Sequence, residues 1–151
     1  MKNVLAPLLL AGAGACAAFA QAPAPVTVQG AWARGTVTGQ ESTGAYMTLT
    51  ASEPLTLVGA QTAAAGIVEI HEMKMEGDVM KMRAAETLPL AAGKPLQLAP
   101  GGYHFMLMDL KGPFKPGSSI AMTLRFRDAK GVERKLPVSV PVAAAAPTHK
   151  H

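Results

Sequence analysis

Residues 67–85, with the sequence IVEIHEMKMEGDVMKMRAA, decide the fold. Residues 67–75 and 79–85 have the two-residue alternation and β-branched content that are typical of strands. Glu76-Gly77-Asp78 separates the two runs, and a glycine in so short a connection indicates a tight turn. The stretch therefore predicts a β-hairpin.

The same pattern extends in both directions from this hairpin. We expect strands at residues 26–34, 45–50, 55–61, 103–110, 120–127 and 133–140, with short extended pieces in the proline-punctuated stretch 88–100. Helical periodicity is almost absent, and roughly eight short strands at about 8–12-residue spacing predict an antiparallel β-sandwich. The expected core members are Leu57, Ile70, Leu107, Leu124, Leu136 and Val138, with Trp32 and Tyr46 at the edge of the core.

The N-terminus has the features of a secretory signal peptide. Lys2 precedes the apolar run Val4 to Leu10, and small residues follow up to Ala18-Phe19-Ala20, an A-x-A-like cleavage site. The apolar run is too short for a transmembrane helix, and we expect no membrane-spanning segment. We predict a signal peptide at 1–20, a linker and strand start at 21–30, a β-sandwich domain at 31–142 and a tail at 143–151. The expected location is the periplasm.

The single cysteine, Cys16, lies inside the predicted signal peptide. It could instead be a lipoprotein acceptor, although the preceding Ala13-Gly14-Ala15 lacks the usual leucine. Cleavage before Gln21 leaves a mature chain without cysteine, which excludes disulfides, zinc-thiolate sites and a cysteine nucleophile. Such a chain suits an oxidising compartment, where a thioether survives better as a ligand than a thiol.

Charge and motifs exclude several function classes. The net charge of +4 falls to +3 without Lys2, and no Lys/Arg cluster is interleaved with aromatic residues, so we expect no nucleic-acid binding. We find no Gly-x-Ser-x-Gly, no phosphate-binding glycine loop and no His-Glu-x-x-His, and we therefore predict no enzymatic activity. A redox copper site of the His₂Cys type would need a cysteine.

Methionine is the unusual feature of the composition, with nine in a chain that has one Trp, two Tyr and four Phe. In a strand, residues i and i+2 share a face, so His104 lies beside Met106 and His71 beside Met73. If the hairpin lies next to strand 103–110, then His71, Met82, His104 and Met106 can surround one ion. Imidazole and thioether donors favour Cu(I), whereas Zn(II) would accept the histidines but not the sulfurs.

The remaining candidate ligands have two interpretations each. Met73 could be an auxiliary ligand or a packing residue, and Met75 and Met80 could form a methionine rim or simply pack. We expect Met108 to be a core residue. In the tail, His149 and His151 could bind Cu(II) weakly, or the tail could be solvated and free of metal.

The spacing of the four main candidates resembles a known signature. Ten residues separate His71 from Met82, twenty-one separate Met82 from His104, and one separates His104 from Met106. This is the pattern of the periplasmic copper chaperone family (PCu(A)C-type). The segments 31–34, 45–47, 68–72 and 102–108 also look like recurring segments of that family, so the resemblance covers about residues 31–140. Ala51-Ser52 departs from it, since the family often has an asparagine there.

The resemblance implies a fold and a function. It implies an antiparallel Greek-key β-sandwich of cupredoxin-like fold that binds Cu(I) as a metallochaperone. It further implies delivery to the copper-A centre of subunit II of cytochrome c oxidase, alongside a Sco-type copper protein. We expect a monomer. Two alternatives stay open: copper buffering or tolerance without delivery, and an adhesion or assembly β-sandwich without metal.

Overall fold

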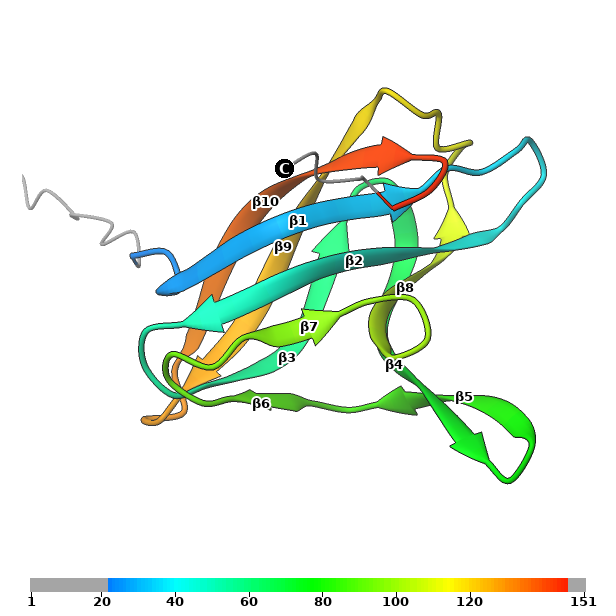
Figure 1. Cartoon of the computed structure of the whole chain (residues 1–151). Helices are drawn as coiled ribbons and strands as arrows, with labels where there is room; N and C mark the ends of the chain where they lie inside the picture. The colour runs from blue at the N-terminus through cyan, green and yellow to red at the C-terminus, as the bar shows by residue number, and fades with distance from the viewer. Residues whose placement is uncertain (1–21, 147–151) are drawn as a thin grey trace, which may run out of the picture.

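Alternating apolar and polar side chains produce ten strands in the computed structural model, which describes residues 22–146 (Figure 1). The strands are β1 (Val26–Arg34), β2 (Ser42–Ala51), β3 (Leu55–Thr62), β4 (Ala65–Glu76), β5 (Val79–Ala85), β6 (Leu88–Leu90), β7 (Leu96–Leu98), β8 (Tyr103–Leu110), β9 (Ser119–Asp128) and β10 (Glu133–Ala143). The predicted 67–85 hairpin is confirmed as β4 and β5, and β6 and β7 are the short pieces expected in residues 88–100.

The strands form two layers. One layer has the order β5-β4-β8-β2-β1, with β7 paired to the second half of β2, and the other has the order β10-β9-β3-β6. The layers join where β1 runs parallel to β10, through Ala33↔Val142 and Arg34↔Ala143. The pairings within each layer are antiparallel. The all-β prediction is therefore confirmed, with one parallel contact that the sequence did not indicate.

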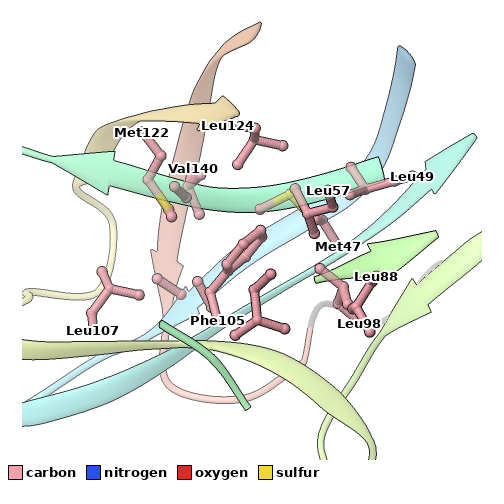
Figure 2. Packing of buried hydrophobic residues seen from close by; sticks show 14 of the residues in the cluster. Met47, Leu49, Leu57, Leu88, Leu98, Phe105, Leu107, Met122, Leu124 and Val140 are labelled. Atoms are coloured by element: carbon pink, nitrogen blue, oxygen red, sulfur yellow. The ribbon is translucent and has the colours of Figure 1, made fainter. Parts of the chain in front are cut away.

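The core lies between the layers and is filled by large apolar side chains (Figure 2). Phe105 and Leu107 from β8 meet Leu57, Met122 and Leu124 from the opposite layer. The predictions of Leu57, Ile70, Leu107 and Leu124 as core residues are confirmed. Leu136 and Val138 are only partly buried, because β10 pairs with β1 only at the other end of the strand.

The β4–β5 hairpin extends beyond the body of the molecule (Figure 1). Strand β8 pairs with β4 only as far as Glu72↔Tyr103, whereas β5 continues along β4 to Glu76↔Val79. The last residues of β4 therefore have a strand neighbour on one side alone. Across residues 22–146 we find no helix with the length and apolarity to cross a membrane.

Candidate metal centre

Two histidines lie directly opposite each other on adjacent strands. The register pairs His71 of β4 with His104 of β8, and their ring centroids are 5.9 Å apart with the planes inclined at 59°. The neighbouring pair, Ile70 and Phe105, is buried in the core. Because successive strand residues point to opposite faces, both imidazoles lie on the outer face of the layer.

In each imidazole, one ring nitrogen is within hydrogen-bond distance of an oxygen and the other makes no hydrogen bond. Nδ1 of His104 lies 3.1 Å from the carbonyl oxygen of Gly102, and Nε2 of His71 lies 2.8 Å from a carboxylate oxygen of Glu69. These oxygens accept, so the contacted nitrogens carry the protons, and in a neutral imidazole the other nitrogen then keeps its lone pair. Nδ1 of His71 is buried without a hydrogen-bond partner. An imidazole oriented in this way by an oxygen is typical of metal-ligating histidines.

Burial keeps His104 neutral. Its side chain is almost fully enclosed, and this desolvation lowers the pKa of His104 below 6.5; the Gly102 carbonyl opposes the change and nearby His71 adds to it. A neutral imidazole is the form that binds a metal. His104 therefore presents a lone pair at neutral pH.

Met106 lies close to the histidine pair. It is two residues from His104 on the same face of β8, is half-buried, and faces Glu69 across the register. The structure thus brings together three of the four predicted ligands, namely His71, His104 and Met106.

Met82 lies on the same face but further away. It pairs with Met73 of β4, and β4 separates β5 from β8. The hairpin was expected to lie beside strand 103–110. Its first strand, β4, pairs with β8, whereas β5 lies two strand spacings, about 10 Å, from β8. Met82 is exposed and is a diagonal neighbour of His71, so its flexible side chain must extend over β4 to reach the pair.

The other candidates are placed as follows. Met73 shares the face of His71 and is half-buried. The expectation that Met108 packs in the core is wrong: it faces outward, half-buried, and opposes the exposed Ile67. The predicted signal peptide with Cys16, and the tail histidines His149 and His151, lie outside the described residues.

An aromatic cluster encloses the other side of His104. The Tyr46 ring lies 6.1 Å from His104 and 4.8 Å from Trp32, and the Arg34 guanidinium lies 5.8 Å from the Trp32 ring. Gly44 opposes Met106, and a Cβ at this position would collide with the Tyr46 hydroxyl, so the glycine leaves the space that the tyrosine ring occupies.

The sequence predicts Trp32 and Tyr46 at the edge of the core. Both are buried on the outer face, because the adjacent residues on the two strands, Ala33 and Ala45, point into the core.

The donor set of this face combines imidazole with thioether. Among residues 22–146, no group of three or more His, Cys, Asp or Glu side chains is placed to hold a metal ion. An ion bound by both imidazoles here would take its further protein donors from the methionine sulfurs of the same face. Such a mixed nitrogen and sulfur set suits a soft cation.

The sequence and its fold are similar to those of known proteins. The family model described as "Putative lipoprotein LpqE-like" matches residues 26–142. A protein of Leifsonia xyli subsp. xyli, described as "Putative lipoprotein Lxx21020", is 36% identical over 143 residues, which cover 89% of this chain and 84% of that protein.

Solved structures of PCuAC domains share the fold. The copper-bound PCuAC domain from PmoF2 is 23% identical, with a TM-score of 0.65 over 83% of this chain and 97% of that domain. The solution structure of apo-DR1885 from Deinococcus radiodurans is 34% identical, with a TM-score of 0.60 over 96% of this chain and 95% of that one. CuI-DR1885 is 37% identical, with a TM-score of 0.56 over 80% and 79%. These matches confirm the cupredoxin-like fold and the resemblance to PCu(A)C proteins.

The burial of His104 predicts a pH dependence of the metal-free protein. In the unfolded chain the imidazole binds a proton near pH 6.5, whereas in the folded chain it does so only at lower pH. The unfolded state therefore binds more protons as the pH falls through this range, and His104 contributes stability above pH 6.5 that is lost as the pH falls through its folded pKa. Urea denaturation across this range should show a shallower loss for His104→Gln than for the wild type. An NMR titration midpoint of the His104 ring at or above 6.5 would contradict the assignment.

Proposed function

The chain belongs to the LpqE-like lipoprotein family, and on that premise we propose that it binds Cu(I) outside the cytoplasm and passes it to a receiving protein. The observation that carries this proposal is the cross-strand pair His71 and His104, each with a ring nitrogen free of hydrogen bonds, on the same face as Met106. We propose His71, His104, Met106 and Met82 as the ligands.

The unpaired nitrogen of His71 supports a metal at this point. A buried polar atom without a partner costs about 1–3 kcal/mol, and a metal ion bound to Nδ1 would remove that cost. Glu69 would hold the opposite nitrogen in its protonated form and keep the ring oriented. The fold and the free nitrogens therefore suit a metal-binding pair better than a structural one.

The thioethers favour Cu(I) over other metals. Soft sulfur donors select Cu(I), and Zn(II) prefers thiolate, imidazole and carboxylate. Relatives support the same metal, since DR1885 has been solved with CuI and the PmoF2 domain with copper. A neutral donor set also leaves the charge of the bound ion uncompensated, which allows release to a receiver with anionic ligands.

The difference in burial among the ligands suits transfer. His104 is enclosed by Tyr46 and the strand, whereas Met82 is 47% exposed. In the proposed transfer a donor of the receiving protein binds the ion from the Met82 side while the Cu–S bond to Met82 breaks. The ion stays Cu(I), and no proton or electron moves. The exposed thioether is thus the first ligand to leave, and the buried imidazole is the last.

The receiver that we propose is the copper-A centre in subunit II of cytochrome c oxidase, with a Sco-type copper protein acting alongside. This rests on the PCu(A)C resemblance of residues 31–140. Copper buffering without delivery is the competing function. Both use the same ligands, and they differ only in whether the ion leaves for a specific acceptor.

The proposed place of action is the periplasm. Membership of a lipoprotein family supports export and adds weight to Cys16 as a lipid acceptor. Cleavage before Gln21 would release a soluble chain, whereas lipidation of Cys16 would anchor it. Either route exports residues 22–146, and the intact mass of the mature protein distinguishes the two.

Replacing His104 with Gln and Met106 with Leu should lower the Cu(I) affinity by more than about 100-fold, because even groups that only orient a ligand change metal affinity by about 10–100-fold. Anaerobic competition with a chromophoric Cu(I) chelator measures this. The matched control is Met122→Leu, which removes a buried core thioether on β9 of the opposite layer and should bind as the wild type does. Unchanged affinity in the double variant would contradict the ligand assignment.

Delivery and buffering separate in a transfer experiment. Cu(I)-loaded protein is mixed with the apo copper-A domain of an oxidase subunit II, and the metal content of each protein is measured after separation. We expect copper to appear in the oxidase domain faster than the loaded protein releases it to a chelator when no oxidase domain is present. Copper that stays with the loaded protein, or leaves only at the rate of release into buffer, would favour the buffering function.

A further inference from the structure

Four methionines form a compact group at the end of the projecting hairpin. The register pairs Met73 with Met82 and Met75 with Met80, and all four lie on the face of His71. We call these four residues the methionine block. The last pair between β4 and β8 is Glu72↔Tyr103, and the Met73 N–H donates to the carbonyl of Gly102 just before β8, so no strand pairs with β4 beyond Met73 on that side.

Packing does not account for the methionine block. Met75 is 57% exposed, Met80 48% and Met82 47%, and none belongs to the core cluster. Methionine usually fills gaps in a core, and here three of four side chains face solvent. Exposed thioethers gathered in opposed pairs need another explanation.

The opposite face of the hairpin is charged. Lys81 lies 3.1 Å from Glu76, and Arg83 lies 3.4 Å from Glu72, both across the strand pair. The hairpin thus separates its side chains into an ionic face and a sulfur face. The pairs help to hold the strands in register while leaving the sulfur face open.

We propose that the methionine block is a second Cu(I) site, with Met73, Met75 and Met80 as donors, and that it loads or unloads the histidine centre. The proposal rests on the proposed function. Directly opposed strand residues have Cβ atoms about 4.5–5.5 Å apart, and diagonal ones lie about 7–8 Å apart. The three rotatable bonds of methionine let sulfurs at these spacings turn toward one ion. An all-thioether site is soft and uncharged, which favours Cu(I).

Met82 connects the two sites. It faces Met73 within the block and is a diagonal neighbour of His71. An ion held by the block can gain a bond to Met82 as its bond to Met80 breaks, and then a bond to Nδ1 of His71 as its bond to Met73 breaks. Each step exchanges one neutral donor for another, and the ion remains Cu(I). The block is more exposed than the centre, so it would be the weaker site.

The test uses the full mature chain with ¹³C-labelled methionine methyl groups and ¹⁵N-labelled histidine rings, and Cu(I) is added without oxygen. The first equivalent should shift the methyl signal of Met106, and the second should shift those of Met73, Met75 and Met80. The double variant Met75→Leu/Met80→Leu keeps the size of both side chains and removes their sulfurs. It should take up one Cu(I) where the wild type takes up two. Met108→Leu, outside the block, is the matched control and should still take up two.

The outcomes separate the two proposals. If the Met106 methyl and the imidazoles respond but Met75 and Met80 stay unmoved through the second equivalent, the block is not a site and the histidine centre stands. If the double variant still binds two ions, the block is likewise excluded. If Met106 and both imidazoles never respond, the proposed function itself fails.

Discussion

The antiparallel register that sets His71 opposite His104 is the constraint on which the rest of the structure depends. The core fixes this register, because Ile70 and Phe105 are buried as the neighbouring pair. A slip of β4 by one residue against β8 would turn Ile70 out of the core and the His71 imidazole into it. The hydrophobic core therefore holds the two donors in place without containing them.

The outer face changes gradually from enclosed to open. At one end, His104 lies behind Tyr46, Trp32 and the Gly44 position that admits the tyrosine ring. At the other end, the hairpin carries its thioethers into solvent. A carrier of metal needs both conditions, since an enclosed imidazole retains the ion and an exposed sulfur allows exchange. The same face thus combines retention with release.

Much of this could be predicted from the sequence, and the remainder depends on long-range pairing. Two-residue alternation predicted β5 and β8 with the bounds that the structure shows. It also predicted that His104 and Met106 share a face. Alternation carries no information about which strands are neighbours, so the position of β4 between β5 and β8 was not foreseen, nor was the distance of Met82. Met108 was expected in the core, one step further in than Met106 on the same face, yet that face points outward along the whole of β8. The orienting oxygens of Glu69 and Gly102 follow from rotamers that no spacing reveals.

The central claim is that one Cu(I) is shared by imidazole nitrogen and methionine sulfur on this face. Copper K-edge X-ray absorption of the full mature chain loaded with a single equivalent of Cu(I) tests it most directly. The structure predicts a cuprous edge and a first coordination shell that needs both nitrogen and sulfur scatterers. A shell made only of nitrogen or oxygen would contradict the account, because the thioethers would then take no part in binding.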